Sequence, residues 1–410
     1  MRRSRRGRSE GSRPRRVLII VQNLSVPLDR RVWMECRALV AAGYGVSVIC
    51  PRGPGEGAFE ELEGVRIHRY AAPPPARGPA GYLWEFVYCW MRTSWLALRI
   101  SRRERFDAIQ ACNPPDTYFA LAAPYKLAGR RFVFDQHDLN PEVYVSRFER
   151  PNRVLLFGLR MLEKLTYRTA DHVISTNDSY RRVALERGRK RPADVTVVRS
   201  GPDVLLMRRG DPRPELRRGK RHLLVYLGIM GPQDGVDLAL RALRVLVDEY
   251  GRDDFHAAFL GFGDCYDDLV SLCGELGLDD RVTFTGRADL EMISAYLSTA
   301  ALGLDPDPMN PLNDVSTMNK VMEYMAFELP TVAFDLTETR VSAAGAATYA
   351  EPNDVRAFAK AVDALLDDPA ARTRMGAEGR RRVEDVLAWE HQAGPYVDVY
   401  RRLIGDPREP

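Results

Sequence analysis

The chain contains two stretches of almost unbroken apolar residues, Val17–Val21 and His222–Leu227. Runs of this kind are typical of strands that are buried on both faces of a parallel sheet. The first run leads through a loop into a helical stretch, Trp33–Ala42, and then into a second strand, Val46–Cys50. The second run is followed by a glycine-containing turn and a helix, so the α/β pattern starts again. The sequence therefore predicts two similar α/β halves, with ligands at the carboxyl ends of their strands.

The length of the chain agrees with this division, because 410 residues are enough for two domains of ordinary size. The segment Arg199–Arg221 is rich in Arg, Pro and Gly, and this change of composition marks the predicted boundary. We expect an N-terminal domain over residues 17–205, a second domain over 206–385, and a closing helix and tail over 386–410.

The charge of the chain is unevenly distributed. Residues 1–16 contain eight Arg and one Glu, a net charge of +7, whereas the whole chain carries +4, which leaves −3 for the remainder. The body is therefore not a basic nucleic-acid-binding surface, and no nucleic-acid partner is expected for it. Composition predicts a disordered tail over 1–16, which is either an inert solvated extension or a segment that contacts anionic lipid or nucleic acid.

The cysteines and the N-terminus indicate the compartment. The six cysteines are scattered without a CxxC pair, which argues against both a zinc site and a disulfide scaffold. No apolar run of signal-peptide length precedes Val17. We therefore expect no metal and a location in the reducing cytoplasm.

The stretch Pro311–Phe334 is predicted to form a loop, a short helix, a break and a buried strand. Ser316 or Thr317 is expected to cap the helix, because a hydroxyl there accepts a bond from an unpaired backbone N–H. Lys320 and Glu323 share one face, opposite an apolar stripe. A cation at a helix N-terminus favours a phosphate, and a carboxylate can bind ribose hydroxyls. The same spacing also fits an ordinary solvated ion pair, so spacing alone leaves both readings open.

The sequence NKVMEYMAFELPTVAFD in this stretch resembles the donor-site signature of family 4 glycosyltransferases (glycosyltransferase group 1), which have the GT-B fold. The match is carried by Lys320, Glu323, Tyr324, Met325, Ala326, Pro330 and Val332. The opening VQNLSVPLDRRVWMECRALVAAGYGVSVICP resembles the start of the N-terminal domain of the same family. The resemblance implies two Rossmann-like, doubly wound α/β domains that face each other across a cleft. It also implies that the last helix, Trp389–Leu403, crosses back to the first domain.

The resemblance further implies roles for residues of the C-terminal half. Glu323 would hold the ribose, Lys320 the diphosphate and Arg287 the nucleobase. The nearby GFGDCY does not form a dinucleotide motif, because Tyr266 replaces its third glycine. The other expected donor-binding residues are Gly228, Gly231, Ser316, Thr317 and Asn319.

The chain departs from the family pattern where the phosphates would bind. Ile229 and Asp234 stand where many members have an Arg and a Lys, and the loop Asn23–Arg31 lacks the usual glycine pair. Lys320 would then be the diphosphate cation, with help from Arg340 or from the two N-terminal arginines at positions 30 and 31. Arg30 and Arg31 are interpreted as acceptor or phosphate contacts.

A further departure affects the sugar site. Val315 stands where the first Glu of the family's E-x7-E pair would fall. Asp314, or the backbone amides of Ser316–Met318, would hold the sugar hydroxyls instead.

A second polar group, DQHDLNPE, begins at the end of the predicted strand Arg131–Phe134. A lone His is more often structural than catalytic, but the resemblance implies that His137 contacts the transferred sugar or the acceptor. Asp138 or Glu142 would then accept the proton of the acceptor hydroxyl.

The stretch Tyr82–Ile100 is the most aromatic part of the chain. Its charged residues Glu85, Arg92 and Arg99 recur every seven positions and line one face of a predicted helix. Three charges argue against a transmembrane span. Two positions remain open for this helix: buried against the N-terminal sheet, or in the membrane interface with Trp and Tyr at headgroup depth.

The activity implied by the resemblance is that of a retaining, metal-independent hexosyltransferase without a cofactor. It would move a sugar from a nucleotide-sugar donor to a hydroxyl of a lipid-linked or polysaccharide acceptor, in cell-surface polysaccharide or glycolipid synthesis. It would act in the cytoplasm, in peripheral contact with the anionic inner face of a membrane. Two alternatives remain open. One is an isomerase similar to the nucleotide-sugar 2-epimerases, and the other is a non-catalytic GT-B partner subunit.

Overall fold

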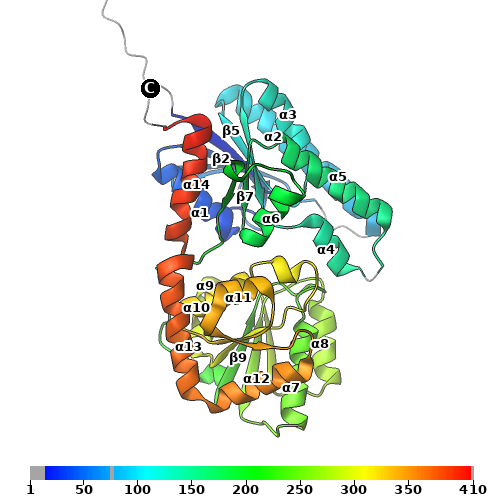
Figure 1. The fold of residues 1–410 in the computed structure, drawn as a ribbon, viewed down its shortest axis with the longest axis vertical. Coiled ribbons are helices and arrows are strands. Elements are labelled where there is room, and N and C mark those ends of the chain that lie inside the picture. Colours follow the sequence, from blue (N-terminus) through cyan, green and yellow to red (C-terminus); the bar gives the residue numbers. More distant parts are fainter. Residues whose placement is uncertain (1–13, 74–77, 149, 408–410) are drawn as a thin grey trace, which may run out of the picture.

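The computed structural model describes residues 14–73, 78–148 and 150–407. The basic tail expected over residues 1–16 lies almost wholly outside these described residues. The described chain forms two α/β halves, one above the other in Figure 1, and each half is built on its own sheet. We call them the N-terminal half and the C-terminal half.

The sheet of the N-terminal half has the strand order β3-β4-β2-β1-β5-β6-β7-β8. All of its pairings are parallel except that of β3 with β4, which is antiparallel. The strands are β1 (Arg16–Ile20), β2 (Gly45–Pro51), β3 (Phe59–Leu62), β4 (Val65–Tyr70), β5 (Ala108–Cys112), β6 (Arg131–Gln136), β7 (His172–Ser175) and β8 (Val195–Val197).

Helices cover both faces of this sheet. Alternate side chains of β1 point to opposite faces and are apolar on both, so both faces must be shielded from water. Val17 and Ile19 belong to an apolar cluster with α1 and the last helix, whereas Leu18 and Ile20 belong to a second cluster with α2 and α3. A strand that is apolar on both faces can be buried only in this doubly covered arrangement. The helices of this half are α1 (Arg30–Ala41), α2 (Gly78–Arg103), α3 (Tyr118–Leu127), α4 (Asn140–Arg147), α5 (Arg153–Thr169) and α6 (Asp178–Glu186).

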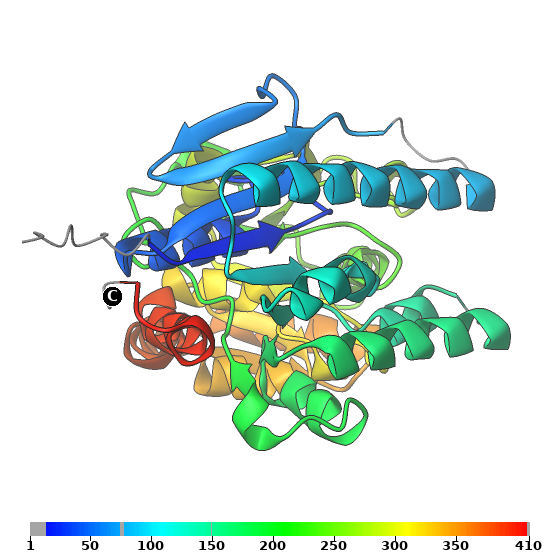
Figure 2. The same ribbon diagram turned by 90° about the horizontal axis from the view of Figure 1, so that it is seen from above.

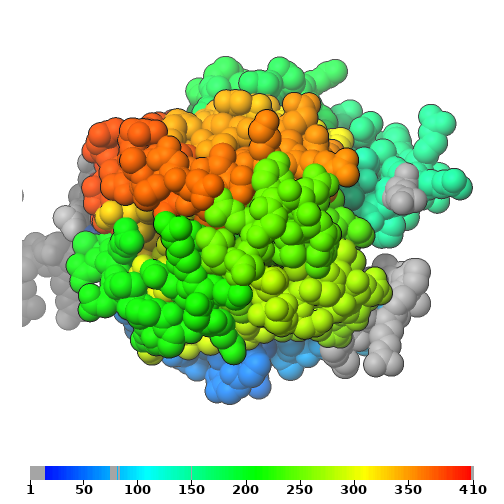
Figure 3. Space-filling model, turned by 90° about the horizontal axis from the view of Figure 1, so that it is seen from below, coloured from blue at the N-terminus to red at the C-terminus, as the bar shows by residue number. Residues whose placement is uncertain are grey.

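The sheet of the C-terminal half is parallel throughout and has the order β11-β10-β9-β12-β13-β14. Its strands are β9 (His222–Leu227), β10 (Phe255–Leu260), β11 (Val282–Gly286), β12 (Leu302–Asp305), β13 (Thr331–Phe334) and β14 (Ala347–Ala350). Its helices are α7 (Val236–Asp248), α8 (Tyr266–Glu275), α9 (Leu290–Thr299), α10 (Asn319–Ala326), α11 (Thr337–Ala343), α12 (Val355–Asp367) and α13 (Pro369–Arg382). Figure 3 shows the underside of this half, with α12 and α13 in orange beside α7 in green.

The last helix, α14 (Trp389–Ile404), crosses back to the N-terminal half, as Figure 1 shows in red. Its Tyr396 hydroxyl donates to Gln110 Oε1 at 2.7 Å, and its Tyr400 hydroxyl donates to the same oxygen. The predicted fold class, with two Rossmann-like halves and a crossing terminal helix, is therefore confirmed.

The two halves also touch directly where α4 and α6 meet the loop before α10. Leu139 and Tyr180 of the N-terminal half form an apolar cluster with Leu312 of the C-terminal half. Asn177 Nδ2 donates to Thr317 Oγ1 at 3.0 Å, next to this cluster. The carboxyl end of β7 is thus brought against the segment that begins α10.

The aromatic helix α2 is longer than the predicted stretch and has two apolar faces. One face packs on the sheet through Cys89, Leu96 and Ile100, which are buried. The other face is exposed, and Trp84 on it retains 59% of its accessible surface. The predicted packing against the N-terminal sheet is therefore found for one face of this helix, and the interfacial position stays a prediction for the other face. Among the described residues, no helix is long and apolar enough to cross a membrane.

Candidate active site

The loop between β9 and α7 holds two of the predicted phosphate-binding glycines. Gly228 has φ +159°, and a Cβ there would lie 3.3 Å from Lys320 Cε. A side chain at position 228 would therefore crowd the lysine. The N–H of Gly231 donates to Asp234 Oδ2 at 2.7 Å, so this loop folds back on its own carboxylate.

The GFG segment after β10 supports this loop. A Cβ at Gly261 would lie 1.8 Å from the carbonyl oxygen of Gly228, which shows how closely the two loops approach. Gly261 also donates its N–H to Gly286 O at 3.0 Å. These glycines are therefore needed for loop-to-loop packing.

Lys320, on the first turn of α10, is not a free cation in this structure. Its ammonium group lies 3.3 Å from Asp305 Oδ1, contacts Asp307 Oδ2 and lies 5.3 Å from the centre of the Tyr226 ring. Burial alone would lower the pKa of Lys320, but Asp307, Tyr226 and Asp305 raise it well above its ordinary value. The lysine is therefore charged and tightly paired.

The carboxylates around Lys320 were missed by the sequence analysis. Burial and the neighbouring Asp307 raise the pKa of Asp305 well above its usual range. Burial and Asp307 also raise the pKa of Asp234, to about 6. The available signal was the sequence LDPDP, which places two Asp residues at the carboxyl end of the strand β12.

Glu323 lies one turn further along α10, at the junction of the two halves. Its Oε1 is 2.8 Å from Nη2 of Arg30, and its side chain is 12% exposed whereas that of Arg30 is 55% exposed. Burial raises the pKa of Glu323, and Arg30 opposes this shift. Lys320 and Glu323 thus each pair with a residue outside α10, so the reading as a solvated ion pair within the helix is wrong.

The predicted cap of α10 is also wrong. Met318 is the residue that precedes the helix, and it makes no side-chain hydrogen bond to the first turn. Ser316 Oγ instead donates to Leu312 O at 2.7 Å, and Thr317 Oγ1 accepts from Asn177 Nδ2. Ser316 Oγ also lies 2.9 Å from the Tyr180 hydroxyl, so both hydroxyls join the two halves, a role that depends on the tertiary structure. Asn319, also predicted to bind the donor, is exposed at the start of α10.

His137 follows β6 and is held by a buried polar network. Its Nε2 lies 2.8 Å from Asp135 Oδ2, and Asp135 Oδ1 accepts from Arg31 Nη2 at 2.9 Å. Burial would raise the pKa of Asp135, but Arg31 and His137 hold it well below its usual range. The ring of His137 is thus fixed by an ionised carboxylate.

Arg31 belongs to this network, and all of its described bonds are to protein groups. Its guanidinium donates to Val198 O at 2.9 Å and to Ser200 Oγ at 3.0 Å, and it pairs with Glu35 at 3.1 Å. The side chain is buried. The expectation that Arg31 contacts acceptor or phosphate is therefore contradicted, whereas its neighbour Arg30 does face the other half.

In the part of the chain that is described, Cys112, Asp135 and His137 bring potential metal-ligand atoms within 4.8 Å of one another. Asp135 already accepts from Arg31 and from Gln110 Nε2, the latter at 2.9 Å. A second cation beside the Arg31 guanidinium is unfavourable. We therefore assign this cluster to hydrogen bonding, and the expectation that no metal takes part stays a prediction.

The two predicted proton acceptors lie in different surroundings. Glu142 pairs with Arg187 through both carboxylate oxygens, at 2.5 and 3.0 Å, and is thereby committed to packing between helices. Asp138 has its backbone fixed by Asn113, whose Nδ2 donates to Asp138 O at 2.7 Å. Burial raises the pKa of Asp138, and His137 and Arg147 oppose this shift. Asp138 is thus the better placed base, and the structure does not support Glu142 in that role.

Three further predicted residues lie near the strand ends of the C-terminal half. The guanidinium of Arg287 lies 4.4 Å from the centre of the Phe262 ring, and both side chains are exposed to solvent. Arg340 is bound to Asp335 and stacks on a tyrosine, so it does not extend to Lys320. Asp314 Oδ1 accepts a hydrogen bond from Thr337 N at 2.8 Å, so this oxygen of the predicted sugar-binding carboxylate already has a partner in the protein.

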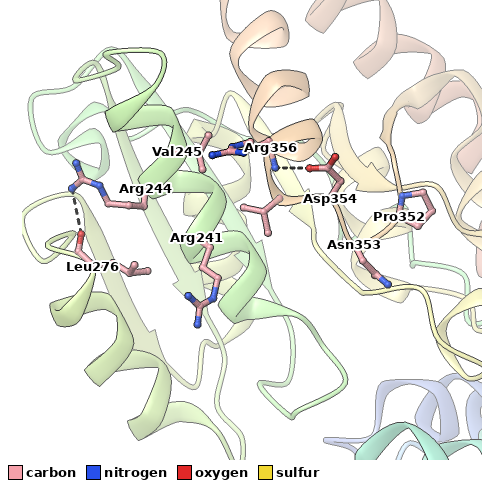
Figure 4. Close-up of a pocket in the computed structure, with 9 residues that line it drawn as sticks. Arg241, Arg244, Val245, Leu276, Pro352, Asn353, Asp354 and Arg356 are labelled. Atoms are coloured by element: carbon pink, nitrogen blue, oxygen red, sulfur yellow. Dashed lines mark hydrogen bonds between the residues drawn. The ribbon is translucent and has the colours of Figure 1, made fainter.

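A separate hollow of about 650 Å³ lies in the C-terminal half, between α7 and the start of α12 (Figure 4). Arg241 and Arg244 line it from α7 and Arg356 from α12. None of its lining residues belongs to the group around Lys320 and Glu323.

Comparisons with known proteins identify the family of both halves. Residues 28–201 match the model of the glycosyl transferase 4-like domain, and residues 221–368 match that of the glycosyl transferases group 1. The 2-deoxystreptamine glucosyltransferase of Streptomyces kanamyceticus is 26% identical over 78% of this chain and 84% of its own length. The D-inositol 3-phosphate glycosyltransferase of Kineococcus radiotolerans is 27% identical, and the match spans 60% of each protein.

Solved structures share the fold. The sucrose-phosphate synthase of Thermosynechococcus elongatus superposes with a TM-score of 0.77 at 20% identity, over 95% of this chain and 99% of that one. The Anabaena protein HepE, solved in complex with UDP-glucose, has a TM-score of 0.70 at 16% identity, over 94% of this chain and 99% of that one.

Proposed function

Because the chain belongs to the group 1 glycosyltransferases with the GT-B fold, we propose that it transfers a sugar from a nucleotide sugar to a hydroxyl acceptor, with retention at the anomeric carbon. The observation that carries this proposal is the position of α10. It places a buried carboxylate and a buried ammonium one turn apart, where the two halves meet. The related Anabaena protein binds UDP-glucose.

The residues divide into donor and acceptor groups. Glu323 binds the ribose, and Arg287 with the Phe262 ring holds the nucleobase. Lys320 binds the diphosphate. The N–H of Gly228 donates to Leu260 O at 3.0 Å and that of Gly231 donates to Asp234, so these glycines serve by letting the loop lie close to the lysine. For Lys320 this means an exchange of partner, in which phosphate oxygens replace Asp307. A charged, preorganised donor at this point stabilises the negative charge that develops on the leaving diphosphate.

The reacting groups come from the N-terminal half. The bond between the anomeric carbon and the diphosphate oxygen breaks, and a bond from that carbon to the acceptor oxygen forms. His137 orients the sugar from its fixed position beside Asp135, and Asp138 takes the proton of the acceptor hydroxyl. Burial favours this transfer, because a carboxylate with a raised pKa is a stronger base.

The proposed activity is tested by incubating the protein with UDP-, GDP- and ADP-sugars, with and without a membrane extract as the source of acceptor. We expect one donor to release its nucleoside diphosphate faster when the extract is present, and NMR of the product to show the donor's anomeric configuration. An inverted product would contradict retention. Conversion of the sugar nucleotide without transfer would indicate an isomerase, and absence of both release and binding would indicate a partner subunit.

We further propose that the acceptor is carried by an anionic membrane, as in glycolipid or cell-surface polysaccharide synthesis. Support comes from α2 and α5, which project from the N-terminal half on the same side (Figure 2). Both expose apolar side chains, including Trp84 and Trp95 on α2 and Val154 and Phe157 on α5. Arg92 and Arg99 lie within 5.6 and 5.4 Å of the Trp95 ring, so cations border the apolar surface. Apolar rings edged by arginines fit a layer of anionic headgroups.

A double substitution tests this surface. Trp84→Glu with Phe157→Glu should weaken binding to vesicles that contain anionic lipid by about tenfold or more. In the wild type each exposed ring would leave water on binding, and burial of this apolar surface favours the bound state. Vesicle co-sedimentation measures the effect. Leu127→Glu is the matched control, since Leu127 is 92% exposed but lies on α3. Equal binding by the double variant and the wild type would contradict the membrane proposal and leave the transferase proposal standing.

A further inference from the structure

The phosphate-binding end of the C-terminal half has too little positive charge for a diphosphate. Ile229 and Asp234 occupy the loop positions where cations were expected. Lys320 is already paired with the carboxylates of Asp305 and Asp307, and Asp234 adds a third acidic group nearby. A doubly or triply charged diphosphate placed there needs a further cation, because like charges in a buried site repel strongly.

Arg147, the last residue of α4, lies beside this loop although it belongs to the N-terminal half. Its Nε donates to Gln233 Oε1 at 3.2 Å, and its Nη1 lies 3.8 Å from Asp264 Oδ2. Gln233 precedes Asp234 in the loop after β9, and Asp264 lies in the loop after β10. The guanidinium therefore spans the two loops whose glycines pack together.

The charge of Arg147 affects the pKa of one carboxyl group in each half. Burial raises the pKa of Asp138 in the N-terminal half and that of Asp234 in the C-terminal half, and the charge of Arg147 partly opposes both shifts. Arg147 ends the helix that follows Asp138, and it donates to Gln233, the neighbour of the carboxylate that accepts from Gly231. This position lies between the acceptor side and the diphosphate side of the proposed reaction.

The present partners of Arg147 are easily exchanged. Gln233 is neutral, and the carboxylate of Asp264 is distant and 75% exposed, so the pair contributes little. The Arg147 side chain itself is 38% exposed and accessible to a ligand. By contrast, Arg30 is bound to Glu323 and Arg340 to Asp335. A guanidinium can bind two phosphate oxygens at once, which an ammonium cannot.

We propose that Arg147 supplies the second cation for the diphosphate of the donor and reaches it from the opposite half of the molecule. This inference rests on the proposed function, since it concerns the same donor. It means that the donor is held by both halves, so that loss of the diphosphate after transfer loosens their junction. Asp234 and Gln233 hold the loop and Arg147 in place until the donor arrives.

Calorimetric titration with UDP, GDP and ADP tests this role. Arg147→Met should weaken binding of the preferred nucleoside diphosphate about tenfold to a hundredfold, the range for hydrogen bonds to charged groups, and leave binding of the free nucleoside unchanged. The affinity of Arg147→Lys for the nucleoside diphosphate should lie between those of the wild type and Arg147→Met, because the positive charge remains but the contact to two phosphate oxygens is lost. Arg160→Met is the control, since it removes an exposed arginine on α5.

The outcomes separate the two proposals. If the wild type binds none of UDP, GDP and ADP, the proposed function fails, and the role of Arg147 fails with it. If the wild type binds and Arg147→Met binds equally well, only the role of Arg147 is overturned. An equal loss for the nucleoside and the nucleoside diphosphate would also overturn it, because that loss would not come from a phosphate contact. Unchanged melting temperatures of the variants show that they are folded.

Discussion

Lys320→Met is expected to lose both stability and transferase activity. The substitution leaves Asp305 and Asp307 buried without their cation, and breaking a buried ion pair in this way costs about 3–5 kcal/mol. Urea unfolding measures the loss. Activity should fall below detection, because the leaving diphosphate also loses its ammonium donor.

The loss of stability should depend on pH with a defined sign. A buried carboxylate whose pKa is raised in the folded protein is neutral in acid, and its charge destabilises the fold as the pH rises through that pKa. Burial already raises the pKa of Asp305 in the wild type, and removal of Lys320 raises it further. The variant should therefore come closest to wild-type stability near pH 4 and fall behind it as the pH approaches 8.

A compensated variant separates stability from catalysis. Lys320→Met combined with Asp305→Asn and Asp307→Asn removes the cation and both charges, so most of the lost stability should return. Activity should not return, since no ammonium group is present. If the triple variant recovers turnover, Lys320 serves only to neutralise the two aspartates, and the assignment of Lys320 to the diphosphate is wrong.

Glu323→Ala is expected to lower kcat/KM about tenfold to a hundredfold with little change in stability. A buried carboxylate that binds a ribose hydroxyl makes a hydrogen bond worth about 1.5–3 kcal/mol, and each 1.4 kcal/mol is a factor of ten. The ion pair that is lost involves Arg30, which is 55% exposed, so its removal has little effect on folding. Initial rates with the preferred nucleotide sugar, together with a urea melt, measure both quantities.

Arg30→Ala is the matched control for Glu323. It breaks the same ion pair but leaves the carboxylate free for the ribose, so donor binding should not weaken. A loss in Arg30→Ala as large as that in Glu323→Ala would mean that the ion pair, and not a ribose contact, is what the donor site needs.

The sequence predicted the elements of this site better than their partners. The apolar stripe Met318, Val321, Met322 and Met325 is buried as expected, because helical periodicity alone decides which face turns inward. The family assignment from the residues of α10 is confirmed by the matches to both halves. The domain boundaries at residues 205 and 385 stay predictions.

Several of the differences concern partners that are distant in sequence. Arg31 and Arg30 are adjacent, and nothing local shows that the first is buried against Asp135, 104 positions away, while the second reaches Glu323. Glu142 was expected as an alternative base to Asp138, and the local sequence does not show that it pairs with Arg187, 45 positions further along the chain. One local signal did exist, the i,i+4 spacing of Arg31 and Glu35 on α1.

The central claim, that the C-terminal half binds a nucleoside diphosphate through α10, is tested most directly by thermal unfolding of the wild type and Glu323→Ala with UDP, GDP and ADP. A ligand present at a hundred times its Kd adds about 2.7 kcal/mol to the stability of the protein that binds it. We predict a clear rise in the Tm of the wild type with one of the three nucleotides, and a much smaller rise for the variant at the same concentration. No rise for the wild type with any of them, or an equal rise for both proteins, would contradict the claim.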